Sequence, residues 1–238
     1  MAATPRSTPS REKERAEHRW PAAIAILVAV VAYATLPSSF TPALRYVVVG
    51  LAVALFVPLI IINPHRLKRE TTWSKWFSRS VIGLLLGANM IALVQLVYQL
   101  VAESKGGPEL LLAALQVWVT NVIAFALVYW EMDRGGPIAR RNLPRDQVEI
   151  ADFRFPQDED HDAIDEVRAR SSKESDWMPG YVDYLYFSAS DSMAFSPTDV
   201  MPLSHRAKLL MVVEAFSGFV ILALVIARAV SLLGGGAG

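Results

Sequence analysis

The stretch that decides the fold runs from Tyr181 to Leu233, near the C-terminus. It opens with the aromatic, half-apolar segment Tyr181-Val-Asp-Tyr-Leu-Tyr-Phe-Ser188, breaks at Phe195-Ser-Pro-Thr-Asp199, and continues into the apolar run Arg206 to Leu233. A half-length helix, a polar turn and a full-length apolar helix form the layout of a re-entrant pore loop followed by a transmembrane helix. Non-helical backbone at membrane depth is tolerated only where protein or a water-filled cavity covers it. The layout therefore indicates a cavity at the turn.

Several short segments of this stretch form a recognisable pattern. They are Tyr186-Phe187-Ser188, Asp199-Val200, Pro202-Leu203-Ser204, Ala207-Lys208, and Glu214-Ala215 to Gly218 through Val225-Ile226-Ala227-Arg228. The pattern resembles the pore helix, filter exit and inner helix of bacterial potassium channels. The resemblance covers residues 181–233 of 238 and implies a pore-domain fold. A working pore would also imply a homo-oligomer, because a single pore loop cannot surround an axis.

The filter itself departs from the family. Where potassium channels carry Gly-Tyr-Gly-Asp, this chain has Ser196, Pro197, Thr198 and Asp199, so only the final aspartate matches. A potassium filter replaces the ion's hydration shell with backbone carbonyls, and glycine favours that arrangement because it adopts left-handed dihedrals at little cost. Proline fixes its own φ and biases the preceding Ser196 towards extended conformations. The favoured interpretation is a channel-like fold kept as a packing unit, with conduction of potassium or of another ion as the alternative.

Composition places the chain in the membrane. Hydrophobic residues make up 53% of the chain, and several apolar runs approach or exceed the ~18 residues typical of a spanning helix. We expect an all-α integral membrane protein of the bacterial inner membrane, with about five transmembrane helices and a re-entrant segment before the last one. The expected spans are Trp20–Leu36, Pro42–Asn63, Ser80–Ala102, Pro108–Trp130 and Arg206–Leu233.

The chain divides into five regions on this interpretation. They are a polar N-terminal tail (1–19), a four-helix transmembrane region (20–131), a charged soluble loop (132–176), the pore-loop-like segment with the last span (177–233), and a flexible glycine-rich end (234–238).

The basic residues beside short loops predict the orientation. The N-terminal tail and the second connector carry five Lys or Arg each, which places the N-terminus and the 132–176 loop in the cytoplasm and Gly238 outside. In potassium channels the pore loop enters from the outer face instead. Either the unit is inverted here or the charge rule misleads, and both alternatives stay open.

Two charged connectors suggest partners. The second connector combines Arg66, Lys68, Arg69, Lys75 and Arg79 with Trp73, Trp76 and Phe77, a pattern of interfacial anchors that would also suit anionic lipid head groups.

The loop section 146–176 holds eleven acids and four bases, and we expect a solvated loop, with a short helix from His161 to Arg170, that binds a cytoplasmic protein. Asp158, Asp160 and Asp162 match the first ligand positions of a calcium loop, but Ala163 and Ala169 break the motif.

Polar residues inside the spans have two interpretations. Six of them in the third and fourth spans either bond across helices or line a polar pathway: Asn89, Gln95, Gln99, Gln116, Thr120 and Asn121.

In the last span Glu214 and Arg228 are ionisable and too far apart to pair in one helix. Glu214 either accepts a hydrogen bond from the pore-like segment or lines a cation-accessible cavity. Gly218, one turn on, would allow a hinge or close packing.

Signatures of catalysis are absent from the sequence. The four histidines are scattered, no phosphate loop or nucleophile motif occurs, and there is no cysteine. The net charge is zero, which gives no global field for nucleic acid. We therefore expect no enzyme, cofactor, metal site or nucleic-acid partner. Three functions remain: a non-conducting interaction or scaffold protein, which is favoured, an oligomeric ion channel of altered selectivity, and a small membrane transporter.

Overall fold

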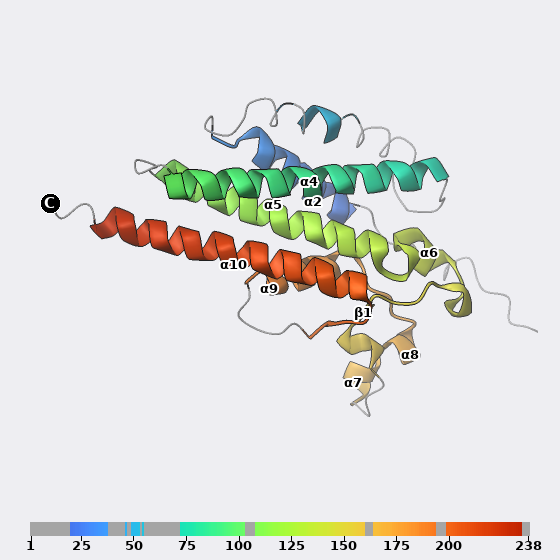
Figure 1. Ribbon diagram of the computed structural model, residues 1–238. Helices are drawn as coiled ribbons and strands as arrows, with labels where there is room; N and C mark the ends of the chain where they lie inside the picture. The colour runs from blue at the N-terminus through green and yellow to red at the C-terminus, as the bar shows by residue number, and fades with distance from the viewer. Residues whose placement is uncertain are drawn as a thin grey trace, which may run out of the picture.

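The computed structural model describes residues 20–37, 46, 49–52, 54, 72–102, 108–159, 164–193 and 199–234. It is dominated by long helices that run side by side, with small elements gathered at one end (Figure 1). We call that end, residues 133–180 with 199–204, the cap.

Three of the helices are long and apolar enough to cross a membrane: α4 (Thr72–Ala102), α5 (Pro108–Met132) and α10 (His205–Gly234). These helices confirm the expectation of a helical membrane protein. The first predicted span is helical as α2 (Trp20–Ala34). Its 15 residues extend about 22 Å at ~1.5 Å per residue, less than the ~30 Å of a hydrocarbon core. The second predicted span, 42–63, lies largely outside the described residues.

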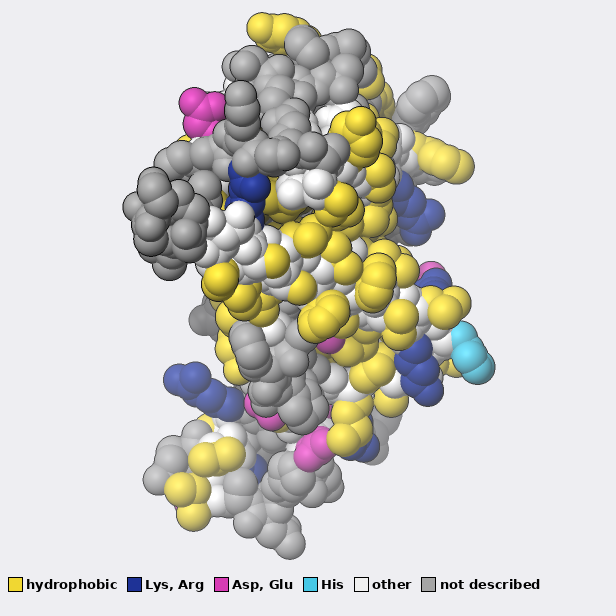
Figure 2. Space-filling model, turned by 60° about the vertical axis from the view of Figure 1, so that its left-hand side comes forward, with side chains coloured by type: hydrophobic (Ala, Val, Ile, Leu, Met, Phe, Trp, Pro, Cys, Tyr) yellow, Lys and Arg dark blue, Asp and Glu magenta, His cyan; other side chains and the backbone are white. Residues whose placement is uncertain are grey.

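Helix α5 is the centre of the bundle. Figure 1 shows it between α4 and α10, with α2 alongside. It is the most buried of the three long helices and α10 is the least. Fully buried Phe125, Leu127 and Tyr129 place the core on α5 at its cap end. The hydrophobic side chains that remain outside form a broad area across the middle of the face shown in Figure 2.

Buried polar side chains link α2, α4 and α5. Asn89 donates from Nδ2 to Oδ1 of Asn121 at 2.7 Å, and the Thr120 hydroxyl donates to Oδ1 of Asn89 at 2.8 Å. The Tyr33 hydroxyl reaches the same Asn89 oxygen at 3.4 Å. These contacts are cross-helix hydrogen bonds, the first of the two interpretations of the amides in the spans.

The chain leaves α5 through a sharp reversal. Arg134, Gly135 and Gly136 have φ values of 54°, 77° and 95°, a region that glycine adopts easily and arginine rarely. The reversal forms η1 (Asp133–Gly135) and leads into α6 (Pro137–Asn142). The rest of the cap contains η2 (Arg145–Gln147), β1 (Phe153–Arg154), η3 (Pro156–Asp158), α7 (Asp165–Arg168), α8 (Ser172–Ser175) and β2 (Met201–Pro202).

Two details of the cap differ from the predictions. Strands β1 and β2 pair antiparallel, with Phe153 opposite Pro202 and Arg154 opposite Met201, so the protein is not strictly all-α. The pairing forms because α10 begins beside the loop and brings residues 201–202 next to 153–154. The predicted helix His161–Arg170 is described only from residue 164, and its helical part is the single turn α7.

Helix α9 (Tyr181–Met193) is the half-length helix expected before the last span. It begins at the cap, where the rings of Tyr181 and Trp130 lie 5.9 Å apart. It ends beside Gly218, the middle of α10, which contacts the Ser192 carbonyl. Helix α9 therefore runs antiparallel to α5 and parallel to α10, and it ends partway along both.

Candidate functional site

Glu214 of α10 lies at the junction of α5, α9 and α10 and is completely buried. The Tyr129 hydroxyl of α5 donates to its Oε2 at 2.7 Å. The Ser188 hydroxyl of α9 makes a very short contact with its Oε1. Each of the three helices thus contributes one side chain to this cluster, which we call the Glu214 cluster. Its contact with Ser188 is the kind that the hydrogen-bonding alternative for Glu214 requires.

Proton counting sets the charge of the Glu214 cluster. The Ser188 oxygen also lies 2.8 Å from the carbonyl oxygen of Val122. A serine hydroxyl carries one proton, so it cannot donate both to this carbonyl and to Glu214. A proton on Oε1 of Glu214 would satisfy both contacts, because the carboxyl group could then donate to Ser188 while Ser188 donates to Val122. No described Lys, Arg or His forms an ion pair with Glu214, which agrees with a neutral carboxyl group.

Aromatic side chains connect the Glu214 cluster to the cap. The ring centroids of Tyr129, Phe153 and Phe187 are 5.0 to 5.1 Å apart. All three residues are fully buried. Because β1 supplies Phe153, the folded loop itself closes this end of the junction.

Gly218 allows the close approach of α9 and α10. A Cβ atom at this position would lie 2.1 Å from the carbonyl oxygen of Ser192 and 2.8 Å from its hydroxyl oxygen. No real Cβ tolerates such a distance to a backbone atom. Glycine is therefore required here by space, since the residue lies inside a regular helix.

Two side-chain oxygen atoms at the end of α9 lack hydrogen-bond partners within the described part of the protein, unlike those of the Glu214 cluster. Oδ2 of Asp191 and Oγ of Ser192 are buried and have no hydrogen-bond partner among the described residues. They precede the predicted filter equivalents, of which Ser196, Pro197 and Thr198 lie outside the described residues. Asp199 is described and is exposed just before β2. Arg228 lies three turns beyond Gly218 on α10 and takes no part in the Glu214 cluster.

Asp133, at the end of α5, organises the cap. It is fully buried, and its Oδ1 accepts from the backbone N–H groups of Asp152 at 2.7 Å and Phe153 at 3.3 Å. Its Oδ2 accepts from the Tyr184 hydroxyl at 2.5 Å. One carboxylate thus joins α5, β1 and α9. The sequence analysis missed this residue, because Asp133 has no local pattern that distinguishes it from a solvated loop aspartate.

Arg206 joins α10 to the same loop. Its Nε and Nη2 donate to the two carboxylate oxygens of Asp152 at 2.7 and 2.5 Å, the two-pronged geometry that makes arginine pairs strong. The backbone N–H of Leu203 donates to the Asp152 carbonyl at 2.7 Å. The Asp152 side chain is buried, whereas the Arg206 side chain is exposed.

Several acids of the 146–176 section have partners inside the cap. Asp158 accepts from Arg134 at 2.5 Å, from the Phe155 N–H and from the Ser172 hydroxyl. This first position of the calcium-like run is thus a structural hydrogen-bond acceptor, and no group of metal ligands occurs among the described residues. Further ion pairs join Arg145 to Asp176, Arg154 to Glu159 and Arg168 to Asp165.

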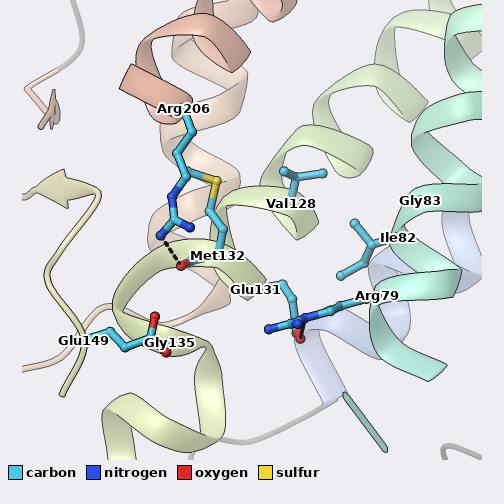
Figure 3. A pocket seen from close by; sticks show the side chains of 9 residues that line it. All are labelled: Arg79, Ile82, Gly83, Val128, Glu131, Met132, Gly135, Glu149 and Arg206. Carbon is cyan, nitrogen blue, oxygen red and sulfur yellow. Dashed lines mark hydrogen bonds and ion pairs between the residues drawn. The ribbon is translucent and has the colours of Figure 1, made fainter. Parts of the chain in front are cut away.

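Two cavities open at the edge of the cap. The first, of about 370 Å³, lies between α4, α5 and the start of α10 (Figure 3). Figure 3 shows Arg79 beside Glu131, with the Arg206 guanidinium and Glu149 at the other side of the opening; the Arg79–Glu131 distance is 3.8 Å. Its charges are balanced between arginines and glutamates. Arg79 is the only basic residue of the second connector whose side chain is described.

The second cavity, of about 300 Å³, lies between α6 and residues 176–178. Arg140, Arg141 and Arg145 line it together with one acid, Asp176. The sequence shows these arginines as the basic part of the soluble loop, but only the fold brings them around a common space.

Comparison of the chain with protein-family models, with curated proteins and with solved structures finds no match in any of the three.

Proposed function

We propose that this chain is a multi-pass membrane protein of the bacterial inner membrane whose potassium-channel-like unit serves as a non-conducting packing module. On this proposal about five helices span the bilayer. Helix α9 is a re-entrant half-helix, and the cap is a cytoplasmic surface for a protein partner. The protein acts in binding or scaffolding.

The observation that carries this proposal is that the Glu214 side chain points into the protein. The one acidic residue of α10 points into the protomer, where Tyr129 and Ser188 satisfy its carboxyl group. The outward face of α10 is apolar instead, with exposed Leu209, Val212, Phe216, Phe219, Ile226 and Val230. An ion path needs polar groups that replace the hydration shell. Helix α10 offers such groups on neither face. Its inward face packs against α5 and α9, and its outward face is hydrophobic.

The course of the chain supports a re-entrant α9. Its 13 residues extend about 20 Å at ~1.5 Å per residue, roughly two thirds of a hydrocarbon core. Six residues further on, Asp199 is again at the cap, next to the β2 strand that pairs with β1. An extended chain covers about 20 Å in six residues, so the return to the side of entry is within reach.

The exposed residues of the cap support a partner surface. Ile150 is 92% exposed and Leu143 is 42% exposed, and the ion pairs described above hold the segments around them in place. A folded cap with exposed aliphatic side chains is a better binding surface than a disordered acidic loop, because less ordering entropy is lost on association.

Ion flux tests the proposal. The purified chain is reconstituted in proteoliposomes with a potassium gradient, and flux is followed with a fluorescent reporter, with the ionophore valinomycin as positive control. We expect the flux of protein-free vesicles. A potassium or sodium flux that rises with the amount of protein would overturn the proposal.

A second function, permeation through an oligomer, is favoured by one observation. Asp191 and Ser192 hold buried oxygens without hydrogen-bond partners in the described chain, at the end of α9 where a channel would bind its ion. If this function is correct, the chain is oligomeric in mild detergent, and Asp191→Asn changes the ion flux. A monomer measured by light scattering would exclude it.

A further inference from the structure

The cavity between α6 and residues 176–178 is the more basic of the two cavities at the edge of the cap. Three arginines line it against one acid, Asp176. The cavity of 370 Å³ at the other edge of the cap has two arginines and two glutamates, so its charges balance. Its volume of about 300 Å³ is at the lower end of the range for small-molecule sites.

The first arginine is held rigidly. Arg140 is 1% exposed, and it donates from Nε to the Pro179 carbonyl at 3.1 Å and from Nη1 to the Trp130 carbonyl at 2.6 Å. Its guanidinium also lies 5.1 Å from the ring centroid of Tyr184, within the range of a cation–π interaction. A buried guanidinium with fixed direction loses little entropy when it binds a ligand.

The other two arginines are held by the segment that follows α8. Arg141 donates from Nη2 to the Met178 carbonyl at 2.8 Å, and Arg145 donates from Nη2 to the Trp177 carbonyl at 2.8 Å. Arg145 also pairs with Asp176 at 3.0 Å. The carbonyl oxygens among these acceptors are neutral, and they orient the guanidinium groups through hydrogen bonds.

One further acid lies close to the cavity. Asp183 accepts a hydrogen bond from the Gly180 N–H at 2.7 Å. Burial raises the pKa of the Asp183 carboxyl, and the Gly180 hydrogen bond, Arg141 and Arg140 oppose that rise. Among the described residues, three arginines therefore lie near two acids, Asp176 and Asp183.

We propose that this cavity is a binding site for a phosphate group, either a monoester or a diester. Planar guanidinium groups suit phosphate because they offer paired N–H donors at the spacing of its oxygens. Two sources share this chemistry: the head group of an anionic phospholipid and a soluble phosphate compound. The site lies where α5 ends, and α5 is one of the helices long and apolar enough to cross a membrane, so a lipid head group can reach it. The inference does not depend on whether the α9–α10 unit conducts ions.

Two variants and one matched control test the site in the full-length chain. Arg145→Gln removes a donor of the cavity. Arg154→Gln is its control, because Arg154 also makes a 3.0 Å ion pair and is similarly exposed, 43% against 45% for Arg145. Asp176→Asn removes the acid that lines the cavity. Asp176 has a φ of 53°, and asparagine adopts this left-handed conformation as readily as aspartate, so the backbone is kept.

Two arms distinguish the sources of the phosphate. In the first, native mass spectrometry follows the retention of phosphatidylglycerol against phosphatidylcholine. In the second, the chain in phosphatidylcholine nanodiscs is titrated with inorganic phosphate and with pyrophosphate at constant ionic strength, and its melting temperature is recorded. Binding in the first arm identifies a lipid head group, and binding in the second identifies a soluble phosphate compound.

We expect the affinity in the positive arm to fall about tenfold in Arg145→Gln, the loss that corresponds to one charge-assisted hydrogen bond. It should rise about threefold in Asp176→Asn as the opposing charge is removed, and stay unchanged in Arg154→Gln. A gain of affinity cannot be explained by misfolding. The proposal is overturned if neither arm shows binding, or if Arg145→Gln and Arg154→Gln weaken binding equally.

Discussion

Glu214 shows how one buried side chain constrains its own chemistry. Its partners Tyr129 and Ser188 come from two other helices, and Ser188 has a second acceptor in Val122. The serine hydroxyl has a single proton and can donate it to only one of these two acceptors. The other contact therefore lacks a hydrogen atom unless Glu214 is protonated. We therefore expect Glu214 to be a neutral hydrogen-bonding unit of the core, although its type suggests a charge.

Substitution of Glu214 tests this protonation state. Glu214→Gln should melt within a few degrees of the parent, because its amide N–H donates to Ser188 and its carbonyl accepts from Tyr129. Glu214→Leu has a similar volume but leaves the buried Tyr129 hydroxyl unsatisfied, at a cost of about 2 kcal/mol. Thermal unfolding in detergent measures both. Equal destabilisation by the two variants would show that the native carboxyl group is ionised.

Gly218 carries the second prediction for a single residue. Gly218→Ala places a methyl group 2.1 Å from the Ser192 carbonyl oxygen, so α9 and α10 must move apart, at a cost of about 1–3 kcal/mol. Gly83→Ala and Gly87→Ala in α4 are the controls, since a Cβ there meets nothing within 4 Å. These two should match the parent or exceed its stability by up to ~1 kcal/mol. A neutral Gly218→Ala would mean that the helices do not pack this closely.

At the scale of elements, α10 depends on the cap for its position. Arg206 and Asp152 hold the start of α10 on β1, and the β1–β2 pair continues the connection. Two residues in each strand are too few for independent stability. The ion pair and the buried Asp133 therefore provide the support that the strand pair lacks.

Loss of that ion pair should loosen the cap without unfolding the bundle. Arg206→Ala leaves Asp152 buried on one side without its charge partner, so residues 199–204 and 152–154 should exchange their amide hydrogens about ten times faster. Hydrogen exchange read by mass spectrometry measures this locally. Lys208→Ala, which removes an exposed base one residue beyond Ala207, should leave exchange as in the parent. Unchanged exchange in Arg206→Ala would contradict the role of the pair.

The whole molecule has small elements gathered at one end and long apolar helices along its length, as Figure 1 shows. The cap, with its arginines and acids, begins where α5 ends and α10 starts. The distribution of basic residues in the sequence predicts that this end lies in the cytoplasm.

Cysteine labelling tests the orientation in a chain that has no cysteine of its own. Ile150→Cys marks the cap at a site that is 92% exposed, and Glu109→Cys marks the opposite end, at the exposed start of α5. In intact cells an impermeant maleimide should label the residue-109 variant alone, while permeabilised cells should show both. Labelling of the residue-150 variant in intact cells would place the cap outside, the orientation of potassium channels.

The helices follow from the sequence because length and apolarity are local properties. The runs that became α4, α5 and α10 each exceed the length of a span, and the break predicted at Phe195–Asp199 separates a half-length helix from a full one. The glycine pair at 135–136 marks a chain reversal for the same reason. None of these features needs a partner from elsewhere in the chain.

The sites were decided by the tertiary structure. Glu214 meets Tyr129 across 85 residues, and Tyr184 meets Asp133 across 51. The three arginines of the α6 cavity donate to carbonyls 32 to 39 residues further on. A polar residue looks the same in sequence whether water or a distant side chain satisfies it. Burial makes the difference, because a buried polar group must find a partner in the protein, and only the packing of α5, α9, α10 and the cap determines which one.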